Sequence, residues 1–535
     1  MAKFTQDKFE GGLWMYGDDT GIPENAYQWL ICGRTRNGSI VPVAQNVELT
    51  TAPAGLKQGL TTLGNIWILF VAGHAYYQLF GTTAWIQIGS FSMSTTADKL
   101  YSQAVPASTM NFKKTLASSG NANQDMQIFP SSIIAGTPSG LVVQDGTNQP
   151  WFIYINESSS LPVARLCKTY AQWKNEEASN AREYVPIGTF MMYMNQKLFI
   201  VTRDKRAIMQ SVSGRPMDFM VNVDSGGKKN IVESRGDALT TSFTFDYEPI
   251  TGIYPSSITD TFIYTTASST RLVALNYTRT IFDEPTYQLA APEIAIGGVN
   301  EKSVIEVLGD TVIIDRENVA SFNSTRQLKV ESKNTIFSKM LTILLEGIKQ
   351  TNRVCIGKYD DYVLVSIQTT FGPVIAIFDS IQNVWVSVDI TSVVQVKEFA
   401  VISTDTSKQI YCITYDNKVF YLYGSEDETE SCMLRTRAFN REDALLEHKT
   451  QQLKLTFAGG SMTDLCRVTE YVDEEVSWSK EQELRYRSEG IKYPVQPPVV
   501  SIDQVMQSPV TFTNPTGLTG RKIHYIIVWT GSASL

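Results

Sequence analysis

Residues 359–388 read YDDYVLVSIQTTFGPVIAIFDSIQNVWVSV, and this stretch indicates the fold class most clearly. Runs of apolar residues, each long enough for one strand, alternate here with short turns. Apolar residues with a period of two, bounded by turn residues, are typical of strands that pair with their neighbours in an antiparallel sheet. The stretch therefore predicts three consecutive antiparallel strands.

The same pattern recurs along the chain as an apolar run, a polar turn and a second apolar run. The other copies are Tyr27–Val43, Leu63–Phe80, Gln149–Leu166, Asn195–Val212, Asp260–Leu275, Leu308–Phe322 and Ser407–Tyr423. A lone hairpin is not stable in water, so these units must cover one another's faces. Their spacing, roughly 45 to 65 residues, is expected for small antiparallel sheets arranged radially. We therefore expect an all-β fold with a β-propeller.

Length and composition agree with this expectation. The chain has 535 residues with 24 Tyr and 24 Phe, and only 19% of its residues are charged, against about 25% in typical soluble domains. The length is typical of several domains or of one large closed architecture. A stack of β-sandwiches would show the same alternation and is the alternative, although no clear linker divides the series of hairpins.

Three stretches depart from the hairpin pattern. Thr83–Gly146 is rich in Ser, Thr, Gly, Asn and Gln, which predicts an inserted polar region near residues 83–146. Ile336–Gln350 spaces its apolar residues at helical intervals, and we expect a helix that packs over a blade edge. After Tyr423 the composition becomes more charged, so a separate C-terminal β-rich domain is expected to begin there.

The charge balance and the two ends of the chain limit its partners. Lys and Arg number 46 against 54 Asp and Glu, which gives a net charge of −8. Proteins that hold nucleic acid through its phosphates normally carry a basic surplus, so tight nucleic-acid binding is disfavoured. Met1–Glu10 lacks the apolar segment of a signal peptide, and no apolar run approaches the roughly 18 residues that span a bilayer. We expect neither secretion nor a membrane span.

The cysteines are too widely spaced for a metal or redox motif. They lie at Cys32, Cys167, Cys355, Cys412, Cys432 and Cys466, and no Cys-x-x-Cys pair occurs. Zinc and redox sites usually place two cysteines close together in sequence. We therefore predict six buried, reduced thiols.

The sequence holds few residues for catalysis. Its three histidines, His74, His448 and His524, lie far apart in sequence, which leaves most acid–base schemes without their usual group. The chain has no Gly-x-Ser-x-Gly, His-Glu-x-x-His, Walker A or Gly-x-Gly-x-x-Gly motif. We expect that the chain is not an enzyme and that it needs no cofactor, and we assign no catalytic, cofactor-binding, metal, channel or gate residue.

Clusters of like charge and exposed tryptophans each allow two interpretations. The acidic clusters Asp18 with Asp19, Asp360 with Asp361 and Glu426–Glu430 read as solvated turns more readily than as catalytic or calcium sites. The lysine pairs Lys113 with Lys114 and Lys228 with Lys229 read as solvated surface, or as loops that touch phosphates. Trp85, Trp151 and Trp173 read as core residues, or as rings that stack on sugars.

Several segments resemble the tail nozzle proteins of short-tailed bacteriophages, which are also known as DNA-stabilisation or tail tubular proteins. They are Gly17–Tyr27 (GDDTGIPENAY), Gly33–Val43 (GRTRNGSIVPV), Ser213–Phe219 (SGRPMDF), Ala376–Val386 (AIFDSIQNVWV) and Arg435–Phe457. The motifs are spread over most of the chain. The region Thr83–Gly146 does not align with the family.

The resemblance implies a propeller with a β-rich platform domain formed by the N- and C-terminal segments. Residues 1–60 would form the N-terminal part of the platform, residues 61–430 the propeller with its inserted polar region, and residues 431–535 the C-terminal part. The family role is a structural virion protein that forms a six-membered ring, closes the portal–adaptor channel, retains the packaged DNA and conducts it at ejection.

The partners implied are further copies of the chain in a homohexamer, the portal and adaptor proteins of the head–tail connector, tail fibre or spike proteins, and double-stranded DNA that passes through the lumen without tight binding. The location is the virion tail, assembled in the host bacterial cytoplasm. A ring of six would carry −48, six times the −8 of one chain, and would repel phosphates and let the duplex slide.

Two other functions fit the sequence. The chain could be a glycan-binding or glycan-cleaving propeller of a tail-associated host-recognition protein, in which exposed aromatic rings stack on sugars. It could also be an interaction propeller of the eukaryotic kind, although it lacks a regular WD or kelch signature.

Overall fold

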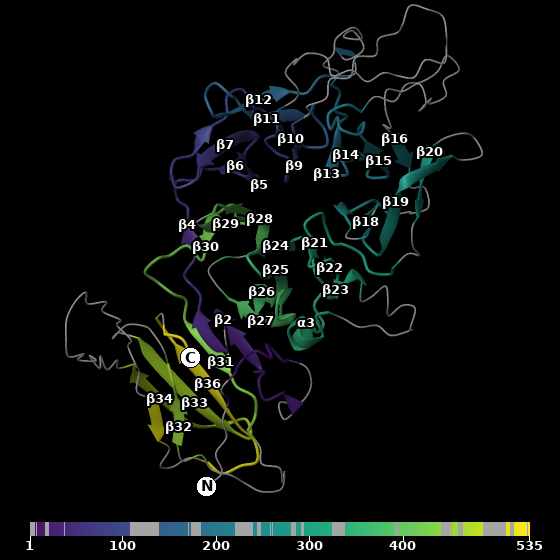
Figure 1. Cartoon of the computed structure of the whole chain (residues 1–535). Coiled ribbons are helices and arrows are strands. Elements are labelled where there is room, and N and C mark those ends of the chain that lie inside the picture. The colour runs from purple at the N-terminus through teal and green to yellow at the C-terminus, as the bar shows by residue number, and fades with distance from the viewer. Residues whose placement is uncertain are drawn as a thin grey trace, which may run out of the picture.

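Figure 1 shows the computed structural model of the chain. The structure describes residues 6, 8–15, 21–36, 38–107, 138–169, 171–172, 183–219, 239–242, 248–256, 258, 260–279, 285–289, 294–323, 337–390, 393, 395–405, 407–439, 450, 452–457, 464–484, 510–513, 518–531 and 533–535.

Small antiparallel sheets stand in a ring and form a β-propeller (Figure 1). We number these sheets as blades 1 to 7 in chain order. In the described part of the chain their innermost strands are β5, β9, β13, β17, β21, β24 and β28. Each of these strands contacts the next, and β28 returns to β5. This closed cycle confirms the propeller and excludes a stack of β-sandwiches.

Blades 1 to 4 follow one another along the first half of the chain. Blade 1 holds β5 (Lys57–Leu63), β6 (Ile66–Val71), β7 (His74–Leu79) and β8 (Ile86–Gln87), and blade 2 holds β9 (Tyr101–Val105), β10 (Gly140–Gln144), β11 (Trp151–Ile155) and β12 (Pro162–Leu166). Blade 3 holds β13 (Gly188–Met194), β14 (Lys197–Thr202), β15 (Ala207–Gln210) and β16 (Leu239–Ser242), and blade 4 holds β17 (Gly252–Pro255), β18 (Thr261–Thr265), β19 (Thr270–Arg279) and β20 (Pro285–Leu289).

Blades 5 to 7 complete the ring. Blade 5 holds β21 (Val304–Val307), β22 (Asp310–Ile314) and β23 (Val319–Ser321), and blade 6 holds β24 (Cys355–Tyr359), β25 (Tyr362–Thr369), β26 (Gly372–Asp379) and β27 (Val384–Asp389). Blade 7 holds β28 (Val396–Ser403), β29 (Lys408–Thr414), β30 (Val419–Leu422) and the N-terminal strand β4 (Val47–Glu48). The three consecutive strands expected in residues 359–388 are β25, β26 and β27.

Both faces of the blades are covered by neighbouring blades. A cluster of buried apolar side chains lies between each pair of adjacent blades around the ring. Every residue of β6, IWILFV, is buried. Trp67 of this strand stacks on Tyr411 of blade 7, with 4.0 Å between the ring centroids. Burial on both faces explains why the middle strands are continuous apolar runs rather than alternating ones.

A strand from near the N-terminus closes the ring. Strand β4 pairs antiparallel with β30, so blade 7 is built from both ends of the propeller sequence. The N–H of Leu49, just after β4, donates to the carbonyl oxygen of Val419 at 2.8 Å. Residues far apart in the chain must therefore meet before the last blade is complete.

A platform sheet continues blade 6 outward. Its strands are β1 (Trp29–Ile31), β31 (Cys432–Arg435), β36 (Ile523–Trp529), β33 (Leu465–Val472) and β34 (Glu475–Glu483), and together with blade 6 they form one nine-stranded sheet. Strand β1 pairs parallel with β27 and antiparallel with β31. N- and C-terminal segments thus share the sheet, which lies beside the ring of blades (Figure 1).

Two small sheets accompany the platform sheet. They are β2 (Gly33–Arg36) with β3 (Ser39–Pro42), and β32 (Gln452–Leu455) with β35 (Val510–Thr513). The platform core is continuous with the core between blades 5 and 6.

The range 83–146 is not a single inserted polar region, because β8, β9 and β10 lie within it. Strand β9, YSQAV, buries only Val105 fully, so it carries little of the apolar signal expected of a strand. Residues 108–137 of this range lie outside the described residues. Residues 1–60 were expected to form only the N-terminal part of the platform. They also supply β4 and the start of β5 to the blades.

The helix expected over residues 336–350 is much shorter. A 3-10 turn, η2 (Lys339–Leu341), leads into α3 (Thr342–Leu345), which ends where Glu346 adopts an extended ψ of 125°. Gly347 follows with a φ of +73°, a conformation that glycine adopts without strain. Leu344 and Leu345 are buried against blade 6, while Ile343 is half exposed.

All six cysteines are free and buried, as predicted. Burial raises the pKa of the thiols of Cys355 and Cys466 to about 12. The thiolate is the reactive form, so these side chains act as apolar core residues.

The closure of blade 7 can be tested at Leu49. Leu49→Pro removes the N–H that donates to Val419, whereas Leu49→Ala keeps it and shortens the side chain. We expect the proline variant to lose about 1 to 3 kcal/mol more free energy of unfolding than the alanine variant, because it leaves a strand carbonyl unpaired. Urea unfolding followed by tryptophan fluorescence measures the difference. Equal losses in the two variants would show that the closing hydrogen bond does not stabilise the ring.

Candidate functional site

The two histidines in the described part of the chain do not come together. His74 lies on β7, where its Nδ1 is 3.3 Å from Nε2 of Gln87. His524 is buried in the platform and stacks on Tyr471, with 5.0 Å between the ring centroids. His448 lies outside the described residues.

The charged clusters that the structure describes lie in turns and loops. Asp360 lies in the turn between β24 and β25 and forms an ion pair with Lys408, and Glu426–Glu430 lies in the loop before β31. Asp18, Asp19, Lys113, Lys114, Lys228 and Lys229 lie outside the described residues. Among the described residues, no group of three or more His, Cys, Asp and Glu is placed to hold a metal ion.

Two of the three tryptophans considered for sugar stacking belong to the core. Trp151 is buried between blades 1 and 2, with its ring centroid 5.3 Å from that of Phe91. Trp85 is partly buried against the cluster between blades 7 and 1. Trp173 lies outside the described residues.

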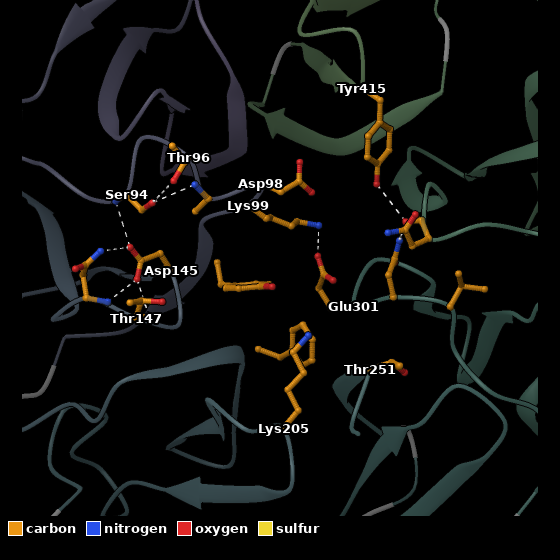
Figure 2. Close-up of a pocket in the computed structure, with 17 residues that line it drawn as sticks. Ser94, Thr96, Asp98, Lys99, Asp145, Thr147, Lys205, Thr251, Glu301 and Tyr415 are labelled. Atoms are coloured by element: carbon orange, nitrogen blue, oxygen red, sulfur yellow. Dashed lines mark hydrogen bonds and ion pairs between the residues drawn. The ribbon is translucent and has the colours of Figure 1, made fainter. Parts of the chain in front are cut away.

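A polar constellation lies at the propeller axis, in a cavity of about 530 Å³ that we call the axial pocket. Its walls are the loops that enter the innermost strands and the turns between the second and third strands of several blades. Figure 2 shows its side chains, with Lys99 and Glu301 pointing toward each other across the middle. The propeller topology therefore gathers residues from at least five blades into one pocket.

A closed set of ion pairs lies at this end of the axis. Lys99 pairs with Glu301, Lys302 pairs with Glu398, and Nζ of Lys397 lies 3.1 Å from Oδ1 of Asp98. Asp98-Lys99, Glu301-Lys302 and Lys397-Glu398 are each adjacent in the chain. The three ion pairs therefore link each of these dipeptides to both of the others. We call them the axial ion-pair ring, and its formal charges sum to zero.

Backbone groups complete the axial ion-pair ring. Oε2 of Glu398 accepts the N–H of Leu60 at 2.8 Å, and Nζ of Lys397 donates to the carbonyl oxygen of Lys57 at 2.9 Å. The side chains of Lys397 and Glu398 are 3% and 6% exposed. Charges this buried cost several kcal/mol each unless they are paired and hydrogen-bonded, to an order of magnitude. The ring therefore ties blades 1, 2, 5 and 7 together.

Pairing shifts the titration of these groups. Burial would lower the pKa of Lys99, but the charges of Glu301 and Glu398 and the contact with Glu301 outweigh it and raise that pKa. Burial would raise the pKa of Glu301, but Lys99 and Lys302 outweigh it and lower that pKa. For Lys397, burial lowers the pKa and the contacts with Asp98 offset only part of the effect.

Asp145 fixes one wall of the axial pocket. Its Oδ1 accepts the N–H groups of Thr147 and Asn148 at 2.8 and 2.7 Å, and its Oδ2 accepts Nδ2 of Asn148 at 2.6 Å. The N–H of Ser94 also donates to Oδ2, at 3.2 Å. Burial would raise the pKa of Asp145, but these hydrogen bonds outweigh it and lower that pKa. The carboxylate joins the β10–β11 turn to the loop between blades 1 and 2.

A second polar constellation connects the propeller to the N-terminal segment. Arg34 donates to Oδ1 and Oδ2 of Asp389 at 3.0 and 2.6 Å and to Oγ of Ser387 at 2.8 Å. The hydroxyl of Tyr423 donates to Oδ2 of Asp389 at 2.7 Å, and the hydroxyl of Tyr27 donates to the carbonyl oxygen of Val386 at 2.7 Å. We call this cluster the platform junction.

The platform junction is buried. The side chain of Asp389 is 0% exposed and that of Arg34 is 12% exposed. The Arg34 guanidinium also lies 5.1 Å from the centre of the Tyr423 ring. Burial works against the charge of Arg34, but the attraction of Asp389 outweighs it and raises the pKa of Arg34.

Sequence reasoning missed both constellations. A signal for the axial ion-pair ring was present, because the chain carries the neighbouring opposite charges Asp98-Lys99, Glu301-Lys302 and Lys397-Glu398 just before or at the start of an innermost strand. Arg34 and Asp389 lie 355 residues apart, and no local pattern relates them.

No family model matches the chain, and no curated protein matches it either. Among solved structures, a chain of the crystal structure of the mitotic checkpoint complex aligns with a TM-score of 0.34 and 6% sequence identity, over 71% of this chain and 93% of that chain. The fold assignment is based on the strand order and on the contacts between innermost strands. None of the helices in the described residues is long and apolar enough to cross a membrane.

The platform junction gives a stability prediction. Arg34→Met leaves the Asp389 carboxylate buried without its cation, so we expect the free energy of unfolding to fall by about 3 to 5 kcal/mol. The double variant Arg34→Met with Asp389→Leu removes both charges and should recover part of this loss. Urea unfolding of the parent, the two single variants and the double variant gives the coupling energy. A loss below about 1 kcal/mol for Arg34→Met would contradict the proposed stabilisation.

The axial ion-pair ring gives a pH prediction. The folded-state pKa of Glu301 lies below its ordinary value of 4.5, so its contribution to stability is present above that value and is lost as the pH falls through the folded-state pKa. Glu301→Gln removes this contribution. The variant should therefore be less stable than the parent at neutral pH, and the difference should shrink below pH 4.5.

Melting temperatures measured between about pH 3 and pH 7 provide this test. Glu306→Gln, which changes an exposed carboxylate on blade 5, is the matched control. A stability difference between Glu301→Gln and the parent that stays constant over this range would contradict the prediction.

Proposed function

We propose that this chain is a ring-forming structural protein of a bacteriophage virion, a tail nozzle that closes the portal–adaptor channel, retains packaged DNA and conducts it at ejection. Its partners would be other copies of itself in a homohexamer, the portal and adaptor proteins, tail fibre or spike proteins, and DNA in the lumen. Its place would be the tail of the virion, after assembly in the bacterial cytoplasm. The role involves no chemical step and no cofactor.

The observation that carries the proposal is the contact between segments that resemble the nozzle family. Arg34 belongs to the segment Gly33–Val43, and it binds Ser387 and Asp389, just after the segment Ala376–Val386. Tyr27, the last residue of Gly17–Tyr27, donates to Val386, the last residue of Ala376–Val386. Segments that are distant in sequence and share the resemblance thus meet at the platform junction. This arrangement is expected if they support one family-specific architecture.

The other described motifs also have structural roles. In Ser213–Phe219, Arg215 and Asp218 form an ion pair of 3.4 Å within a turn that follows β15. In Ala376–Val386, Trp385 is buried with its ring centroid 5.4 Å from that of Phe378, and its Nε1 donates to the carbonyl oxygen of Phe337 at 3.2 Å. The motifs therefore hold turns and strand ends together, as expected for a structural part.

The propeller axis itself is a poor path for a duplex. Its pocket measures about 530 Å³, and the Lys99–Glu301 ion pair crosses it. We therefore place the proposed DNA lumen between subunits of the ring. With −8 on each chain, such a ring would repel phosphates rather than bind them.

The test is the mass and symmetry of the purified chain, alone and with the portal–adaptor complex of the same phage. Mass photometry should show a species of six times the 59.7 kDa chain mass, and electron-microscopy class averages should show six-fold rings, free or docked on the adaptor. A portal ring that lacks the adaptor is the control and should not be capped. A chain that stays monomeric and does not dock would overturn the proposal.

A further inference from the structure

The axial pocket has the dimensions of a small-molecule site. Its volume of about 530 Å³ lies within the roughly 300 to 1,000 Å³ of typical ligand pockets. It is framed by the starts of innermost strands, and the Asp145 hydrogen bonds fix one of its walls. Rigid surroundings hold polar side chains in place and so reduce the entropy lost when a ligand binds.

The pocket wall is rich in neutral hydrogen-bonding groups. Thr96, Thr147 and Thr251 offer hydroxyls, which donate and accept. Asn352 adds a side-chain amide, whereas the amide of Asn300 already bonds backbone groups of Asn352, Val354 and Lys302. Few aliphatic side chains contribute. Thr96 and Thr251 each share one hydrogen bond with a neighbouring hydroxyl, and a hydroxyl can make more than one. An apolar ligand would leave this remaining capacity unused, at a cost of about 1 to 3 kcal/mol for each buried group. The wall therefore favours a ligand with many hydroxyl groups.

The charged groups of the wall already have contacts within the protein, and for Lys205 the contact is with a ring, because its Nζ lies 4.8 Å from the centre of the Phe190 ring. Glu301 pairs with Lys99, and Asp98 pairs with Lys397. Asp145 accepts hydrogen bonds from the loop around it. An ionic ligand would have to break one of these contacts, whereas an uncharged ligand can use the remaining lone pairs and N–H groups. The wall thus favours a neutral ligand.

Aromatic rings complete the lining. Tyr101 at the start of β9 and Tyr415 in the β29–β30 turn are both partly exposed in the pocket. The edge of Tyr101 meets Phe190 at 89°, with 5.3 Å between centroids, which holds its ring in place. Aromatic rings pack against C–H groups, while hydroxyl, amide and carboxylate groups bind O–H groups. A sugar ring presents both kinds of group.

We propose that the axial pocket binds one uncharged sugar residue, either a free monosaccharide or the terminal residue of a glycan. The hydroxyl, amide and carboxylate groups of the wall hydrogen-bond the sugar hydroxyls, and Tyr101 packs against the C–H face. The site is complete within one chain, so binding does not require the hexameric ring of the proposed function.

Saturation-transfer NMR on the full chain tests the proposal. One arm uses glucose, galactose, mannose, N-acetylglucosamine and rhamnose. A second arm uses the purified polysaccharide portion of bacterial lipopolysaccharide. Thr96→Trp introduces a large side chain at an exposed position of the lining, and Ser92→Trp places the same side chain on an exposed position of the same loop outside the lining. Equal melting temperatures of both variants and the parent establish that the fold is intact.

We expect at least one sugar to bind the parent and Ser92→Trp equally, and to bind Thr96→Trp at least about tenfold more weakly. Binding confined to monosaccharides would indicate a free sugar as the ligand, and binding of both probes would indicate the end of a glycan. No binding in either arm, or binding that Thr96→Trp does not weaken, would overturn the proposal. Six-fold assembly is measured separately, so either result leaves the nozzle proposal to its own test.

Discussion

The structure depends on covering both faces of small, twisted sheets with other sheets. A strand such as IWILFV in β6 buries every side chain, so its blade cannot present either face to water. Closing the blades into a ring gives every blade two neighbours, and the apolar clusters between adjacent blades are the result. Ring closure in turn requires a strand from the other end of the propeller sequence, which β4 supplies.

The same geometry determines what lies at the axis. Innermost strands converge there, so residues at their starts come close together even when hundreds of positions separate them in the chain. Lys397 and Asp98 are 299 residues apart and form an ion pair. The side chains of Lys397 and Glu398 lose almost all of their water in this position and must find partners of opposite sign. A set of neutral total charge is the arrangement that meets this requirement.

The sequence predicted the middle strands of the blades well, because they carry the strongest apolar signal. Asn195–Val212 became β14 and β15, and Asp260–Leu275 became β18 and β19. Strands with fewer buried side chains were missed, as with β9, which buries only Val105 fully, and β4, which is two residues long. The axial ion-pair ring and the platform junction could not be derived, since both depend on which blades are neighbours and the number of blades was not known from sequence.

The nine-stranded sheet has a mechanical consequence. From β24 at the propeller axis to β34 at the outer edge of the platform, each strand is hydrogen-bonded to the next, with no loop in between. A force applied at the platform edge is therefore carried across a continuous series of backbone hydrogen bonds into the ring of blades. The propeller and the platform therefore respond to load as one rigid unit. We expect movement under load to be a rotation of the whole subunit rather than a bend between its two parts.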